Sequence, residues 1–174
     1  MKVADCIAFR WFALPGLICV LVGVIHFGGI EGARRLPFGL ALPFICYLLA
    51  SGVVLWLRSV LVFGLDNLSM MYVYFPQEGR LVNASIYSVV RHPVYSAVLR
   101  VVFALVLWNG SLFALFAGTM GLFTLRLWVH FIEEPELLER FGHGYGDYRA
   151  QVPAFFNLNP ITWRKLWRFL VTGL

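Results

Sequence analysis

The sequence has 174 residues, of which 60% are hydrophobic and only 13% charged, with a formal net charge of +5 and a mean hydropathy of +0.79. Soluble domains carry about 25% charged residues, so this composition excludes an ordinary soluble domain and indicates an integral membrane protein. The basic residues flank apolar stretches, which is a topology signal of membrane proteins. We therefore predict a membrane partner and no nucleic-acid partner.

Four apolar stretches approach the roughly 20 residues that a membrane helix needs. The first follows Arg10 and lacks the usual small-residue cleavage site of a signal peptide, so we predict that it is retained. The third is short. The prediction is an all-α, polytopic membrane helix bundle of about four spans plus interfacial helices, forming a single domain over 1–174. The predicted spans are 11–27, 36–57 (extending as far as 63), 93–108 and 111–132.

The distribution of basic residues predicts the orientation of this bundle. An even number of spans places both termini on one face of the bilayer. Ten of the Lys and Arg residues outside the spans lie on that face, and only Arg34 and Arg35 lie on the other. Because cytoplasmic loops carry an excess of Lys and Arg, we predict that both termini are cytoplasmic.

Other segments are too polar or too unusual to span. Residues 66–80 mix methionines and aromatic residues with polar ones, which is compatible with either a re-entrant or a surface segment. Residues 161–170 alternate aromatic and basic side chains, which predicts an amphipathic helix on an anionic leaflet. The three cysteines, Cys6, Cys19 and Cys46, have no metal-ligand spacing, so we expect small buried hydrophobes and no metal site.

Two polar motifs bracket the hairpin formed by the last two spans. Arg91-His92-Pro93-Val94-Tyr95 precedes the hairpin, Glu133-Glu134-Pro135 follows it, and the apolar stretch between them breaks only at 108–111. A hairpin returns the chain to the face from which it started, so both motifs should lie on the same face. Charged groups gathered at one membrane face indicate a functional site.

The chemistry of the two motifs is complementary. Pro93 favours the first position of a helix, so Arg91 and His92 should lie at its positive end, where free N–H groups attract an anion. We expect Glu133 and Glu134 to lie at a helix C-terminus, where the dipole disfavours acids, and Pro135 to stop that helix and start a short one over 136–140. Together the motifs would suit a zwitterion with an additional positive charge, such as S-adenosylmethionine.

The order of these motifs resembles the isoprenylcysteine carboxyl methyltransferase and phospholipid methyltransferase superfamily. The resemblance covers about residues 80–160 and includes Leu137-Leu138, Phe141-Gly142 and Val152-Pro153. It implies a small membrane enzyme that binds S-adenosylmethionine at the cytoplasmic face. Carried over to this sequence, it implies cofactor contacts from Arg91, His92, Pro93, Tyr95, Glu133, Glu134, Tyr145 and Tyr148.

Three positions depart from the superfamily pattern. Ala97 replaces a common glycine, His130 lies near the place of a basic residue that precedes the acidic pair, and Ala154 replaces an arginine after Val-Pro. These departures concern the methyl acceptor more than the cofactor. The implied activity is methyl transfer to a lipophilic acceptor, which is a prenylcysteine-like carboxylate, a lipid amine or a thiol.

Four residues are candidates for catalysis or acceptor binding. An amine acceptor must lose a proton, which Glu134 or His130 could accept, whereas a carboxylate or thiolate acceptor needs no base. Arg100 and Arg126 lie about 10 Å and about 12 Å into the third and fourth spans. They either extend to the interface or line a polar cavity that holds a carboxylate or phosphate.

Two other functions remain open from the sequence. Membrane sterol and steroid reductases carry a similar Arg-His-Pro-x-Tyr stretch and bind NADPH, but Val94 and Ser96-Ala97 differ from their motif. A non-catalytic membrane scaffold of the same fold would fit Ala97 and Ala154. The sequence leaves the methyl acceptor and the oligomeric state open.

Overall fold

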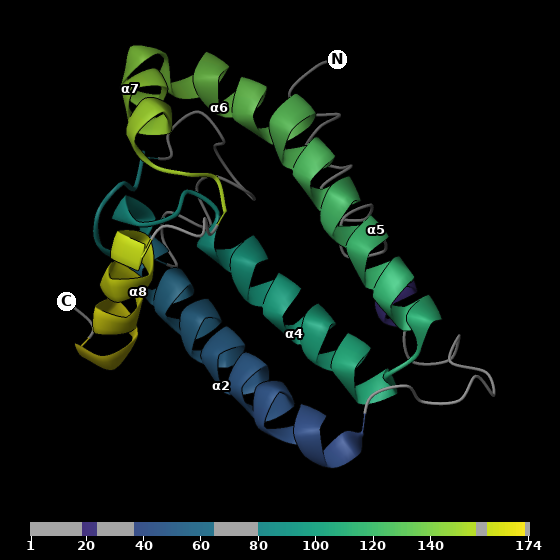
Figure 1. Ribbon diagram of the computed structural model, residues 1–174. Coiled ribbons are helices and arrows are strands. Elements are labelled where there is room, and N and C mark those ends of the chain that lie inside the picture. The colour runs from purple at the N-terminus through teal and green to yellow at the C-terminus, as the bar shows by residue number, and fades with distance from the viewer. Residues whose placement is uncertain (1–18, 24–36, 65–79, 156–159, 173–174) are drawn as a thin grey trace. The chain divides into compact units, whose positions relative to one another are not determined.

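The computed structural model describes residues 19–23, 37–64, 80–155 and 160–172, and all regular elements in these ranges are helical (Figure 1). The all-α prediction is therefore confirmed. In chain order the helices are α2 (Phe38–Phe63), the 3₁₀ helix η2 (Ser85–Ser88), α4 (Pro93–Asn109), α5 (Leu112–Trp128), the π-helical turn η3 (Val129–Glu133), α6 (Glu134–Phe141), α7 (His143–Gln151) and α8 (Pro160–Thr172).

Two helical segments are long and apolar enough to cross a membrane. These are Phe38–Phe63 and the continuous run Leu112–Phe141, while Pro93–Asn109 is a shorter apolar helix. The 17 residues of α4 reach only about 26 Å, slightly less than the roughly 30 Å of bilayer hydrocarbon. The predicted span over 11–27 lies largely outside the described residues, although 19–23 are helical. Most of the predicted interfacial segment 66–80 also lies outside them.

Large apolar side chains remain exposed along the long helices. Leu61 of α2, Phe116 and Phe123 of α5, and Phe131 of η3 are each 59–76% exposed. Exposure of this kind suits helices surrounded by lipid. The prediction that the cysteines are buried is wrong for Cys19 and Cys46, which are exposed, because a thiol is apolar enough to face lipid as well as a protein core. Cys6 lies outside the described residues.

The chain divides into two compact units. The described part of the first comprises 19–23, 37–48 and 101–125. In this unit the predicted turn joins α4 to α5: Gly110 has a φ of +71°, and the Ser111 hydroxyl accepts a hydrogen bond from the N–H of Ala114 (3.1 Å). A Cβ atom on Gly118 would lie 2.6 Å from Cγ2 of Val106, so glycine permits the close approach of α5 to α4 there.

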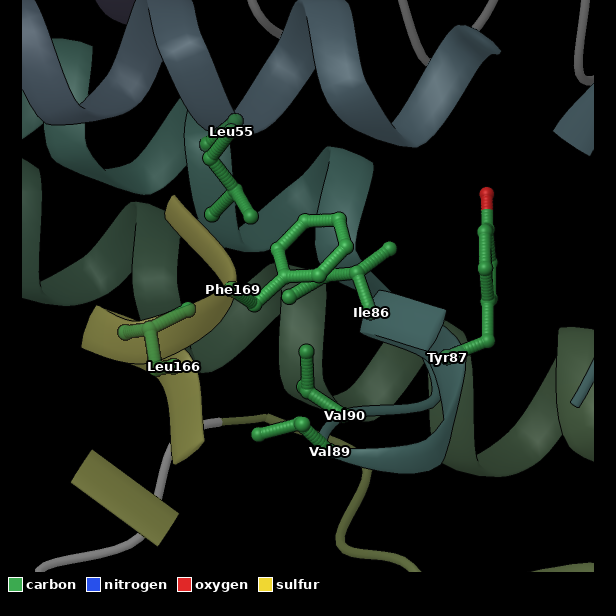
Figure 2. Close-up of a cluster of buried hydrophobic side chains, with 8 residues drawn as sticks. Leu55, Ile86, Tyr87, Val89, Val90, Leu166 and Phe169 are labelled. Atoms are coloured by element: carbon green, nitrogen blue, oxygen red, sulfur yellow. The ribbon is translucent and has the colours of Figure 1, made fainter. Parts of the chain in front are cut away.

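The described part of the second unit comprises 49–64, 80–100, 126–155 and 160–172 and contains a hydrophobic core (Figure 2). The predicted helix over 161–170 is confirmed as α8, and its Leu166 and Phe169 are buried in this core. The apolar side of α8 is therefore not directed solely at lipid. The other buried members come from α2, from η2 and the residues after it, and from the first turn of α4: Leu55, Ile86, Tyr87, Val89, Val90 and Ala97.

The predicted helix stop at Pro135 is wrong. The helix that begins at Leu112 continues to Phe141 through η3, in which the N–H of Glu134 donates to the carbonyl of Val129. The five-residue spacing of that hydrogen bond is a π turn. Pro135 then lies in the first turn of α6, where its missing N–H is tolerated. The predicted end after Phe141 is confirmed, because Gly142 adopts a φ of +56° and donates to the Leu138 carbonyl (2.9 Å).

Candidate functional site

The two polar motifs meet within the second unit. Arg91 and His92 come immediately before α4, and Glu133 and Glu134 lie at the junction of η3 and α6. Arg91 and Glu134 are 43 positions apart in the chain and are directly hydrogen-bonded. His92, Glu133 and Glu134 are each at most 6% exposed. The structure therefore joins the motifs into one buried polar cluster, as the hairpin argument predicts.

Glu134 is held by two guanidinium groups. Nε of Arg91 donates to Oε1 of Glu134 (3.0 Å), and Nη2 of Arg91 contacts the same oxygen. Nε of Arg149 lies 3.1 Å from Oε2. Nη1 of Arg91 donates to the carbonyls of Arg149 (2.7 Å) and Val152. Arg91 thus connects Glu134 to the end of α7, and both side chains are largely removed from solvent.

The backbone N–H groups of Arg91 and His92, in the turn before α4, are occupied, which corrects the prediction for these two groups that they are free for an anion. Arg91 N–H donates to the Pro153 carbonyl (2.9 Å), and His92 N–H donates to the Ala154 carbonyl (3.1 Å). The reason is tertiary, because the extended segment after α7 passes beside this turn. These are main-chain contacts, so replacement of the superfamily's arginine by Ala154 leaves them intact.

His92 lies between the two acids. Its Nδ1 is 3.6 Å from Oε1 of Glu133, and its Nε2 is 3.7 Å from Oε1 of Glu134. Its ring stacks on Tyr95, with centroids 5.8 Å apart and planes inclined by 22°. Burial alone would lower the pKa of His92, but its close approach first to Glu133 and then to Glu134 raises it above the ordinary 6.5. The protonated imidazole is therefore favoured in this cluster.

Glu133 and Glu134 are not at a helix C-terminus, which corrects the prediction about the helix dipole. Glu134 opens α6, so both acids lie inside a continuous helical run. Neighbouring residues of a regular α-helix point about 100° apart, yet both acids are buried. The π turn η3 ends at this pair, and such turns are frequent at functional sites.

The two predicted tyrosines have different environments. The hydroxyl of Tyr148 donates to the Tyr87 carbonyl (2.6 Å), so Tyr148 ties α7 to η2. The hydroxyl of Tyr145 is buried without a hydrogen-bond partner among the described residues, as is Nε2 of His92. Burial, followed by the negative charge of Glu134, raises the pKa of Tyr145. Its hydroxyl therefore stays protonated at neutral pH and can donate to a ligand.

The remaining predicted site residues differ in how deeply they are buried. Pro93 is fully buried and starts α4 as predicted. Arg100 is 8% exposed, and its Nη1 donates to the Ser96 carbonyl (3.3 Å) one turn nearer the cluster. Arg126 and His130 are exposed. Of the two arginines only Arg100 is buried, and the exposure of Arg126 favours the alternative in which it extends to the interface.

Sequence reasoning missed Arg149 as a site residue. From the sequence it is only one of the ten basic residues on the predicted cytoplasmic face, although it follows Tyr148 directly and lies one helical turn after Tyr145. That spacing places it on the same side of α7 as Tyr145. Its contact with Glu134 could be recognised only once the fold had brought α7 beside the acidic pair.

Comparison with known proteins identifies a family for the part of the chain that contains both polar motifs. A family model described as phospholipid methyltransferase matches residues 41–144. The match includes both polar motifs and begins in α2, well before the predicted region of resemblance. No curated protein and no solved structure matches the chain.

Proposed function

Because the chain belongs to the phospholipid methyltransferase family, and so to the superfamily of isoprenylcysteine and phospholipid membrane methyltransferases, we propose that its methyl donor is S-adenosylmethionine. We further propose that the acceptor is a lipophilic molecule reached from the bilayer and that transfer takes place at the cytoplasmic face. The observation that carries this proposal is the buried cluster in which Arg91, His92, Glu133 and Glu134 meet beside Tyr145.

The residues of the cluster suit such a cofactor. S-Adenosylmethionine presents an ammonium, a sulfonium, a ribose diol and a carboxylate. Glu133 would attract its cationic groups, while the Tyr145 hydroxyl and Nε2 of His92 are buried polar atoms that a ligand can satisfy. Glu134 is bound by Arg91 and Arg149, so we assign it to positioning rather than to direct contact. Pro93, Tyr95 and Tyr148 would shape the walls of the site.

When bound, the cofactor supplies a methyl carbon already activated by its sulfonium. The protein's contribution is then orientation of the acceptor and exclusion of water, both of which a buried cluster favours. A carboxylate or thiolate acceptor needs no base. For a lipid amine we propose Glu133 as the proton acceptor in preference to Glu134, because Glu134 is neutralised by two guanidinium groups.

Binding measurements test this function directly. In detergent solution the purified protein should bind S-adenosylmethionine in calorimetric titration and should not bind NADPH, which would be the cofactor of a sterol-reductase-like enzyme. Transfer of an isotopically labelled methyl group into extracted membrane lipids or prenylcysteine analogues would then identify the acceptor. Binding of NADPH alone would exclude the proposal, and absence of both ligands would favour the scaffold.

Arg100 is our candidate for the acceptor side of the site. It is buried one helical turn beyond Ser96 on α4, and ionisable residues inside membrane helices usually mark substrate pathways. In Arg100→Met, cofactor affinity should be retained while turnover falls, mainly through a raised KM if the contact is equally strong in the ground and transition states. Arg126→Met is the matched control, because Arg126 is exposed. Unchanged turnover in Arg100→Met would remove this arginine from the acceptor site.

Sidedness is a separate prediction. Single cysteines at Ser88 and Glu136, in a background without the three native cysteines, should react with a membrane-impermeant reagent from the cytoplasmic side. A cysteine at Asn109 should react only from the opposite side, because the predicted hairpin topology puts the turn at 109–111 across the bilayer from both motifs. Labelling of all three positions from one side would contradict the hairpin topology.

The position of His92 predicts a pH dependence of stability. Its folded-state pKa is raised, so its stabilising effect is complete below the ordinary value of 6.5 and is lost as pH rises through the folded-state pKa. The free energy of unfolding of wild type relative to His92→Gln should therefore be largest under acidic conditions and shrink at higher pH. Detergent-denaturation curves at a series of pH values would measure this. A difference that grows with pH would contradict the raised pKa.

A further inference from the structure

The side chains of helix α8 form three sides that differ in burial and charge, and the spacing of residues along the sequence shows which residues share a side. Leu166 and Phe169 are three positions apart and are buried in the core of the second unit, as Figure 2 shows. Trp167 and Val171 are four positions apart and are 44% and 75% exposed. Residues three or four apart share one side of a helix. An exposed apolar strip therefore runs beside the buried one.

The third side of α8 is basic. Arg164, Lys165 and Arg168 are all exposed, and Arg168 lies four positions after Arg164 and three after Lys165. Helix α8 contains no acidic residue to neutralise them. Arg58 of α2 adds a fourth positive charge nearby, since its guanidinium lies 5.9 Å from the centre of the Phe169 ring. The basic side is thus a local excess of positive charge on the surface of the unit.

The core contacts place α8 beside the ends of two apolar helices. Phe169 and Leu166 belong to a cluster against which Val62 and Phe63, the last two residues of α2, also pack. The same cluster includes Ala97, in the first turns of α4. In a membrane protein the end of one apolar helix and the start of another mark the bilayer surface. Helix α8 is therefore fixed near the level of the lipid headgroups.

We propose that the exposed sides of α8 form a docking surface for anionic lipid headgroups, with Arg164, Lys165 and Arg168 binding lipid phosphates while Trp167 and Val171 insert between the acyl chains. Basic and apolar residues on one interfacial helix have this combined affinity for anionic leaflets. A second copy of the chain, with its net charge of +5, is a poorer electrostatic partner than an anionic membrane. This inference does not depend on the proposed methyl donor or acceptor.

An environment-sensitive probe on the full chain tests the proposal. The Val171→Cys variant, in a background lacking the native cysteines, is labelled with nitrobenzoxadiazole and reconstituted into nanodiscs of phosphatidylcholine alone or of phosphatidylcholine mixed equally with phosphatidylglycerol. We expect emission at shorter wavelength in the anionic discs, and we expect added salt to reverse the difference. Each basic residue near an anionic surface should contribute roughly fivefold to the association.

Two further variants separate charge from fold. In Arg164→Gln/Lys165→Gln/Arg168→Gln the lipid-dependent shift should be lost, whereas in Arg164→Lys/Arg168→Lys, which keeps the charge, it should persist. Both variants should retain wild-type thermal stability, because the substituted side chains are exposed. Equal emission in both kinds of disc would overturn the proposal. So would a shift that depends on the number of protein copies per disc, since that result would indicate a protein partner.

Discussion

The Glu134→Gln variant is expected to lose about 3–5 kcal/mol of unfolding free energy, because breaking a buried ion pair leaves an uncompensated charge. Glu134 faces Arg91 through Nε and Nη2 and Arg149 through Nε, and its own side chain is only 3% exposed. The amide keeps the volume but removes the negative charge between two guanidinium groups. Denaturation of the purified protein in mixed micelles, monitored by loss of helical circular dichroism, would measure the loss.

The matched control for this experiment is Glu139→Gln. It makes the same chemical change on the same helix, α6, at an exposed position, and should change stability by no more than about 0.5 kcal/mol. If Glu134→Gln were as stable as this control, the Arg91–Glu134–Arg149 arrangement would not be a stabilising element. Our assignment of Glu134 to positioning would then be wrong.

The Glu133→Gln variant is expected to bind S-adenosylmethionine at least tenfold more weakly while remaining folded. Oε1 of Glu133 lies 3.6 Å from Nδ1 of His92, whereas Glu134 is held by the guanidinium groups of Arg91 and Arg149. A charge-assisted hydrogen bond contributes roughly 1.5–3 kcal/mol, and about 1.4 kcal/mol corresponds to a tenfold change in affinity. Calorimetric titration in detergent would give the dissociation constant for each variant.

Comparison of the two glutamate variants distinguishes a residue that contacts the cofactor from one that stabilises the fold of the site. Glu133→Asp keeps the charge and should recover part of the lost affinity. Glu139→Gln serves again as the control with unchanged binding. Wild-type affinity in Glu133→Gln would remove the acid from the cofactor site. Equal losses of stability in Glu133→Gln and Glu134→Gln would show that the two acids act as one structural unit.

Local sequence signals were sufficient for much of the helical architecture. Composition indicated a membrane protein, and the four apolar stretches of near-spanning length indicated an all-α fold, because a helix satisfies its backbone polar groups within one segment. The start of α4 at Pro93, the turn at Gly110 and the end of α6 before Gly142 all follow from the backbone preferences of single residues. These features depend on neighbours only a few positions away.

Only some features of the candidate site could be predicted from the sequence. The hairpin argument correctly brought Arg91 and His92 to the acidic pair, because two antiparallel helices fix which ends meet. It treated Glu133 and Glu134 as equivalent, since nothing local distinguishes adjacent identical residues. The structure shows that Glu134 lies between two arginines, while Glu133 lies beside His92. This difference arises because α7 brings Arg149 to Glu134 from elsewhere in the chain.

What the sequence by itself determined about this protein is its class, its helices and the meeting of its two motifs. Only the tertiary structure decided that the N–H groups before α4 are occupied by the carbonyls of Pro153 and Ala154, and that a π turn carries the helix past Pro135. It also distinguished the Tyr145 hydroxyl, which has no partner among the described residues, from that of Tyr148. For the N–H groups and the two tyrosines the physical reason is the same: hydrogen bonds between distant segments depend on packing geometry, which local preferences do not encode.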